Sequence, residues 1–165
     1  MGIFSKLFAK PEEIDPNALY APMAGKAVPV TQVPDATFAE GMLGEGVAIL
    51  PSDGRVYAPC NGTVETMFET GHAVSLKGDN GAEILIHVGL ETVSLGGKCF
   101  KIHVKNGQRV KKGQLLMEAD LKEIQAAGLD TITPVLVCNY DEFSQFQVSP
   151  KDTVTNQDTI ITLNP

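Results

Sequence analysis

The chain has 165 residues, enough for one domain with a substantial core. Its 43% hydrophobic and 20% charged residues are typical of a globular domain, and its net charge of −7 disfavours a nucleic-acid partner, because phosphate contacts require clustered Lys and Arg. No apolar run approaches the roughly 18 residues of a membrane-spanning helix. Cys60, Cys99 and Cys138 are widely spaced. We therefore expect a cytoplasmic protein whose cysteines are small apolar core residues in a reducing compartment.

The first residues leave two interpretations open. Residues 2–10 place Ile3, Phe4, Leu7 and Phe8 at helical spacing. They form either a frayed tail or a short amphipathic helix with weak peripheral membrane contact. We expect residues 1–18 to be a flexible N-terminal segment and residues 19–165 to form a single domain.

Short apolar runs separated by Gly, Pro and Asn follow from Tyr20 onwards. Turn signals recur about every ten residues, which predicts an all-β protein, an antiparallel β-sandwich or flattened barrel. The clearest predicted strands are residues 46–51, 55–58, 62–67, 114–118, 134–138 and 158–163. Two short helices are expected over 36–43 and 120–127, the second capped by Asp120 and ended by Gly128. The pattern Ala-Pro-x-x-Gly occurs at both 21–25 and 58–62, which is typical of two similar, interlocked half-motifs.

Two histidines, His72 and His87, lie in apolar runs that we predict to be neighbouring strands. The segment 79–81, Asp-Asn-Gly, favours a tight turn between them. A two-residue turn at 79–80 would pair the two histidines directly, and one at 80–81 would place them diagonally on the same face. A three-residue loop would put them on opposite faces. With either two-residue turn, both imidazoles should meet at the protein surface.

Adjacent imidazoles suit phosphoryl transfer or metal binding. His87 can offer an unprotonated ring nitrogen near neutral pH, and the flexible backbone at Gly89 leaves carbonyls that can fix its tautomer. His72 can donate a hydrogen bond to phosphoryl oxygens, and Thr70 can orient His72. A structural histidine pair and a zinc site are the alternatives, although stable zinc sites usually have three or four ligands. The absence of G-x-S-x-G, H-x-H and H-E-x-x-H disfavours hydrolases and zinc peptidases.

These motifs resemble the glucose-family enzyme IIA of the bacterial phosphoenolpyruvate-dependent sugar phosphotransferase system. The resemblance is strongest in Glu83-Ile-Leu-Ile-His-Val-Gly-Leu-Glu-Thr-Val93. It extends over nearly the whole chain, through residues 2–8, 21–25, 33–40, 43–49, 58–64, 68–73 and 107–113. It implies a β-sandwich of interlocked half-motifs, the duplicated hybrid motif.

The resemblance also implies a function in sugar uptake. His87 would accept a phosphoryl group on Nε2 from the histidine-containing phosphocarrier protein HPr. It would pass the group to a cysteine of the IIB domain of a glucose-type sugar permease. The chain would then be a phosphotransferase component, not a complete catalyst on its own.

Further residues receive roles from the resemblance. His72 is the supporting histidine, needed more for onward transfer than for charging; Thr70 belongs to its hydrogen-bond network, and the Gly89 carbonyl holds the ring of His87. The docking face corresponds to Ala36, Thr37, Phe38, Leu43, Phe68 and Leu85, with Asp35 and Glu91 on its acidic rim.

No cofactor is expected to be required. In some family members the unphosphorylated protein docks on other permeases or on glycerol kinase, and a zinc ion is shared with the partner. A regulatory binding module in which His72 and His87 share a zinc ion with a partner is therefore the alternative function. A biotin- or lipoate-carrying domain is disfavoured because the hairpin lacks the lysine that such carriers use.

Overall fold

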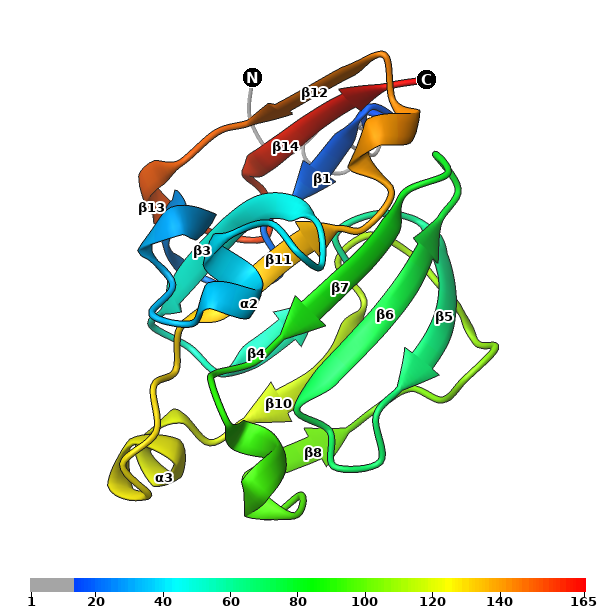
Figure 1. The fold of residues 1–165 in the computed structure, drawn as a ribbon. Helices are drawn as coiled ribbons and strands as arrows, with labels where there is room; N and C mark the ends of the chain where they lie inside the picture. Colours follow the sequence, from blue (N-terminus) through cyan, green and yellow to red (C-terminus); the bar gives the residue numbers. More distant parts are fainter. Residues whose placement is uncertain (1–13) are drawn as a thin grey trace, which may run out of the picture.

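The structure, a computed structural model, describes residues 14–165 and consists mainly of antiparallel strands (Figure 1). The predicted antiparallel β-sandwich with short helices is confirmed. The helix or tail expected over residues 2–10 lies outside the described residues. Within residues 14–165, every helix is too short or too polar to cross a bilayer.

The strands form three sheets, with the orders β13-β2-β3-β11-β7-β6-β5-β9, β1-β14-β12 and β4-β10-β8. Their bounds are β1 Ala18–Tyr20, β2 Gly25–Pro29, β3 Glu45–Pro51, β4 Arg55–Tyr57, β5 Gly62–Met67, β6 Ala73–Gly78, β7 Glu83–His87, β8 Phe100–Ile102, β9 Arg109–Val110, β10 Leu115–Ala119, β11 Thr133–Val137, β12 Gln145–Val148, β13 Lys151–Val154 and β14 Thr159–Asn164. The helical segments are η1 Val30–Gln32, α2 Ala36–Ala39, η2 Thr92–Leu95, α3 Leu121–Ala126 and η3 Tyr140–Glu142.

Both predicted helices are present. Asp120 caps α3 by accepting a hydrogen bond from the Glu123 N–H at 3.1 Å, and Gly128 follows with φ of 81°. The helix α2 is shorter than predicted. It ends at Ala39 because the backbone turns away at Gly41, where φ is 75°.

The sheets consist of two similar halves. When the strands of the large sheet are counted inward from its two edges, β13 corresponds to β9, β2 to β5, β3 to β6 and β11 to β7. The sheet β1-β14-β12 corresponds to the sheet β4-β10-β8. The repeated Ala-Pro segments exchange backbone hydrogen bonds: the Tyr20 N–H donates to the Pro59 carbonyl at 3.0 Å, and the Tyr57 N–H donates to the Pro22 carbonyl at 2.8 Å. The predicted interlocking of two half-motifs is confirmed.

This correspondence gives residues at the centre of the large sheet a counterpart in the other half. In the β6–β7 pair, His87 lies opposite Ala73; in the β3–β11 pair, Leu136 lies opposite Gly46. Leu136 is therefore the counterpart of His87. The connections also correspond: residues 30–44 join β2 to β3, and residues 68–72 join β5 to β6.

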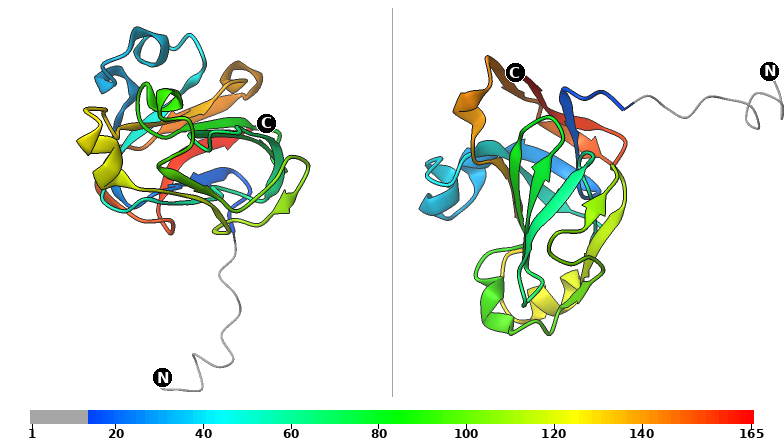
Figure 2. Two further views of the ribbon diagram at one scale, coloured as in Figure 1. Left: turned by 90° about the horizontal axis from the view of Figure 1, so that it is seen from below. Right: turned by 90° about the vertical axis from the view of Figure 1, so that its right-hand side faces the viewer.

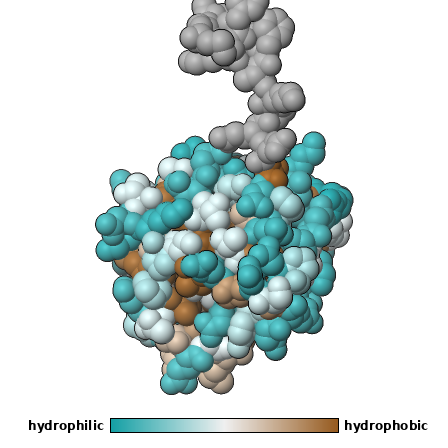
Figure 3. Space-filling view, turned by 90° about the horizontal axis from the view of Figure 1, so that it is seen from above, coloured by the Kyte–Doolittle hydropathy of each residue, from teal (hydrophilic) through white to brown (hydrophobic). Residues whose placement is uncertain are grey.

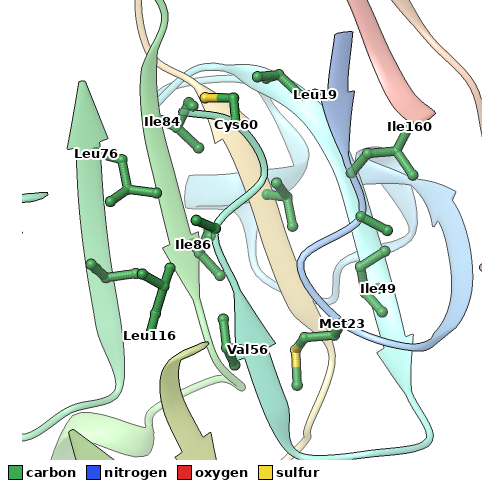
Figure 4. Close-up of a cluster of buried hydrophobic side chains, with 14 of the residues drawn as sticks. Leu19, Met23, Ile49, Val56, Cys60, Leu76, Ile84, Ile86, Leu116 and Ile160 are labelled. Atoms are coloured by element: carbon green, nitrogen blue, oxygen red, sulfur yellow. The ribbon is translucent and has the colours of Figure 1, made fainter. Parts of the chain in front are cut away.

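The main core takes side chains from all three sheets. Figure 4 labels Leu19, Met23, Ile49, Val56, Cys60, Leu76, Ile84, Ile86, Leu116 and Ile160 in it. A second cluster on the outer face of the large sheet holds η1 and α2, which stand out from the sheet on one side (Figure 2). This outer cluster consists of Val28, Val30, Val33, Phe38, Ala48, Leu90, Ile132 and Leu136, with Leu85 packed against it. Because burial of one such large side chain contributes about 1.5–3 kcal/mol, the cluster is sufficient to hold α2 in place.

The surface is largely polar on the face shown in Figure 3, where apolar side chains form small areas among hydrophilic ones. The three cysteines are free. Cys60 and Cys99 are buried as predicted, but Cys138 is exposed, because it follows the last residue of β11 where the chain leaves the core.

The β6–β7 hairpin has a different register from the one we predicted. Its loop has three residues, 79–81, and is closed by the Gly78 N–H donating to the Ala82 carbonyl at 2.8 Å. Gly81 takes φ of 91° at the last loop position, which is the usual geometry of a three-residue hairpin loop. The predicted two-residue turns are therefore wrong. The Asn-Gly pair is compatible with a loop of two or of three residues, so it does not determine the register.

Candidate functional site

The two histidine rings nevertheless lie side by side, with centroids 5.0 Å apart. His87 ends β7, and Figure 1 shows that end beside the start of β6. His72 lies in the bend before β6, directly after Gly71, whose φ is 73°. Strand alternation therefore does not fix the direction of the His72 side chain. The predicted proximity is confirmed, although the predicted strand pairing of the histidines is wrong.

The His87 ring is held through one nitrogen. Its Nδ1 lies 2.7 Å from the Gly89 carbonyl, and since a carbonyl only accepts, Nδ1 carries the proton. Nε2 is then unprotonated and carries a lone pair. Burial lowers the pKa of His87, opposed by the Gly89 hydrogen bond and by the carboxylates of Asp35 and Glu91. The ring is therefore neutral at pH 7, as a nucleophile requires.

His72 is more enclosed than we expected. Its Nδ1 lies 2.5 Å from the Thr70 hydroxyl, and the Phe68 ring packs edge-on with centroids 5.3 Å apart. The residue is only 5% exposed, so the expectation that both rings lie open at the surface is wrong for His72. Its ring is enclosed because it packs between Phe68 and His87. Burial lowers its pKa to about 4, and the neighbouring His87 adds to the shift.

The expected docking residues separate into exposed and supporting ones. Leu43 and Phe68 expose 40% and 38% of their surface, and Ala36 and Thr37 are exposed. Phe38 is buried in the outer cluster, and its ring lies 5.0 Å from that of His87.

The last of the expected apolar docking residues lies beneath this face. Leu85 is half-buried against the outer cluster, and so it supports the face from beneath. Sequence reasoning missed Val93, which exposes 53% of its surface and lines the pocket beside His87. The available signal was position, since Val93 follows Glu91 by two residues.

A shallow pocket of about 220 Å³ opens beside the His87 ring. It is lined by Asp35, Thr37, Phe38, His87, Glu91 and Val93. The Asp35 carboxylate also accepts from the Thr37 N–H at 2.9 Å and so caps α2. Two carboxylates on the rim of an apolar pocket favour a basic partner, mainly by steering its approach.

The site takes its two sides from corresponding connections of the two halves. Residues 30–44 supply Asp35, Thr37 and Phe38, whereas residues 68–72 supply Thr70 and His72. No three His, Cys, Asp or Glu side chains within residues 14–165 gather closely enough to hold a metal ion.

The lowered pKa of His72 predicts an acid-sensitive stability. The unfolded histidine binds a proton near pH 6.5, whereas the folded one binds it only near pH 4. The contribution to the free energy of unfolding is therefore complete above 6.5 and is lost as the pH falls toward 4. Urea unfolding at several pH values should show this loss, and His72→Gln should reduce it. His103→Gln, at a histidine hydrogen-bonded to Glu118, should not; equal slopes for the two variants would contradict the assignment.

Comparisons with known proteins agree with this geometry. The profile of the family described as "phosphoenolpyruvate-dependent sugar phosphotransferase system, EIIA 1" matches residues 17–143. The glucose-specific EIIA component of Staphylococcus epidermidis is 39% identical over 158 residues, covering 95% of both chains. The glucose-specific EIIA component of Halalkalibacterium halodurans is 44% identical over 152 residues, covering 88% of both.

Longer relatives contain the same region as one part. The glucose-specific EIICBA component of Staphylococcus saprophyticus is 43% identical over 143 residues, which is 87% of this chain and 21% of that protein. The chain thus spans about a fifth of the length of such relatives. Among solved structures, glucose permease IIA from Mycoplasma capricolum matches with a TM-score of 0.81 and 33% identity, over 87% of this chain and 93% of that one. The chain therefore belongs to the EIIA type 1 family of the phosphoenolpyruvate-dependent sugar phosphotransferase system.

Proposed function

We propose that His87 is the phosphoryl carrier of this protein. It accepts the group on Nε2 from the histidine-containing phosphocarrier protein HPr and passes it to the cysteine of a IIB domain of a glucose-type permease, in the cytoplasm, during sugar uptake. The observation that carries the proposal is the hydrogen bond from His87 Nδ1 to the Gly89 carbonyl, which leaves Nε2 as the nucleophile. The IIB partnership is supported by relatives named EIICBA and EIIBCA.

The transfer needs little from the protein beyond position and charge. The lone pair of Nε2 attacks phosphorus, and the new N–P bond forms as the N–P bond to the donor histidine breaks. The electron pair of the broken bond stays with the donor imidazole. If the Thr70 hydroxyl donates to Nδ1 of His72, the proton of neutral His72 lies on Nε2, from which it donates to a phosphoryl oxygen.

The surface around His87 suits partners that dock and leave. Phe68 beside His72 and Val93 in the pocket beside His87 offer exposed apolar contacts, while Asp35 and Glu91 attract basic groups. Few of these contacts are fully enclosed, which favours rapid dissociation.

A labelling experiment tests the proposal. The protein is incubated with phosphoenolpyruvate, enzyme I and HPr, and the bound phosphate is counted and tested for stability. We expect one phosphate per chain, labile in acid and stable in base, as a phosphohistidine is. Absence of labelling, or an acid-stable phosphate, would contradict it.

A second candidate function is a regulatory module that docks unphosphorylated on other permeases or on glycerol kinase. The observation that favours it is that both Nδ1 atoms are engaged within the protein; with Nδ1 of His72 donating to the Thr70 hydroxyl, both Nε2 atoms have lone pairs for a zinc ion shared with the partner. Two ligands do not complete a zinc site, so the partner supplies the others.

Zinc should therefore be dispensable for labelling. We expect chelator-treated protein to label at the untreated rate, and zinc binding by the isolated chain to be weak and to fall further in His72→Gln. A stoichiometric zinc ion that survives chelation would instead assign the pair to a resident metal site.

A further inference from the structure

The loop from Val88 to Thr92 determines where the Gly89 carbonyl points. Gly89 has φ of 75° and Glu91 has φ of 60°, and Glu91 is the one residue other than glycine with positive φ within residues 14–165. Such a backbone is costly for a non-glycine residue and persists only where neighbouring groups hold it. The His87 tautomer depends on this loop, because Nδ1 donates to Gly89.

Thr92 holds the loop from inside. It is fully buried, and its hydroxyl donates to the Val88 carbonyl at 2.6 Å. Its methyl group lies against Gly89, where a Cβ on that residue would come within 2.6 Å of Thr92 Cγ2. One side chain thus contacts the Val88 carbonyl and the α-carbon region of Gly89, directly before the carbonyl that orients His87.

Other contacts also restrain the loop, and one of them acts on the peptide unit that carries the Gly89 carbonyl. The Leu90 N–H donates to the Asp130 carbonyl at 3.0 Å, and the Ser94 hydroxyl donates to the Glu91 carbonyl at 2.6 Å. The Val88 N–H donates to the His72 carbonyl at 2.7 Å, which ties the loop to the supporting histidine. The two peptide units that flank Val88 are therefore held separately, one by Thr92 through the Val88 carbonyl and the other by the His72 backbone through the Val88 N–H.

We propose that Thr92 is a positioning residue for phosphoryl transfer. Its hydroxyl and methyl group keep the Gly89 carbonyl directed at Nδ1 of His87, and so keep Nε2 of His87 unprotonated. The effect on transfer rate rests on the proposed function, whereas the effect on the His87 tautomer does not.

The test separates the hydroxyl from the methyl group. Thr92→Val keeps the shape and removes the donor, and Thr92→Ser keeps the donor and removes the methyl group. Thr133→Val is the matched control, because Thr133 is equally buried and loses one hydroxyl bond, to the Thr131 carbonyl outside the loop. Ring-nitrogen NMR of His87 gives the ratio of Nδ1–H to Nε2–H tautomers, and labelling from phosphorylated HPr gives the rate.

We expect Thr92→Val to lower both the tautomer ratio and the labelling rate by about fivefold to tenfold, the size expected for one lost hydrogen bond. Thr92→Ser should restore the tautomer ratio to within about twofold of the wild-type value, and Thr133→Val should leave both quantities unchanged.

If Thr92→Val does not fold, Thr92→Ala, which admits water to the Val88 carbonyl, takes its place with the same expectations. A folded variant with the unaltered tautomer ratio would overturn the proposal, and so would an equal change in Thr133→Val. If wild-type His87 is not labelled at all, the proposed function fails, while the tautomer ratio still decides the role of Thr92.

Discussion

His87→Ala is expected to abolish labelling by phosphorylated HPr. Alanine removes the nucleophilic nitrogen, and no nearby group replaces it: His72 is neutral but enclosed, with only 5% of its surface exposed. Labelling should therefore fall below detection, not merely slow. The measurement is the amount of acid-labile phosphate bound per chain at completion.

The control must show that the variant still folds. Removing the ring leaves the Gly89 carbonyl without its donor, at a cost of about 1–3 kcal/mol of stability. Thermal unfolding should detect this loss of stability, and before heating the variant should still have the strands of the wild-type protein. His103→Ala removes a different histidine, hydrogen-bonded to Glu118, and should label normally. Normal labelling of His87→Ala would show that another residue carries the phosphate.

His72→Gln is expected to separate charging from delivery. Glutamine retains a hydrogen-bond donor for the phosphoryl oxygens but cannot take a positive charge. A phosphoryl group on His87 raises the affinity of the neighbouring His72 for a proton, and the resulting cation stabilises charge as the N–P bond breaks. Labelling should stay within a few fold of wild type, whereas delivery to the IIB domain should fall by roughly 10²–10³-fold.

Delivery is measured by isolating phosphorylated protein and adding the IIB domain, with loss of label followed in time. Thr70→Val provides a graded comparison, because it removes only the hydroxyl that contacts Nδ1 of His72. It should slow delivery less than His72→Gln does. Equal loss of charging and delivery in His72→Gln would show that the histidine acts in both directions alike.

Most of the fold followed from local patterns in the sequence. The strand β5 occupies the predicted residues 62–67, and α3 lies between its predicted cap and glycine. These elements are predictable because turn residues and alternating burial mark them locally. The register of the β6–β7 hairpin was not predictable. It depends on whether Gly81 lies inside or outside the loop, and the same residues fit both loop lengths.

The residues assigned to the chemistry were easier to predict from the sequence than the residues that pack around them. His72, His87 and Thr70 stand out by residue type and are brought together in the structure. Phe38 proved to be a buried support because its exposure depends on how α2 packs, which no local pattern records. Thr92 was missed for a similar reason: a buried threonine in a short apolar segment gives no signal until its acceptor is known.

The two halves of the sheet differ most in what covers them. Leu136, the counterpart of His87, is sealed beneath the long connection that contains η1 and α2, while the shorter connection of the other half leaves His87 accessible. Reactivity at this position is therefore a matter of loop length as well as residue type. Because the long connection supplies Asp35, Thr37 and Phe38 to the pocket whereas the short one supplies Thr70 and His72, we expect substitutions in the long connection to change partner choice with the reactive His87 and its strand left as they are.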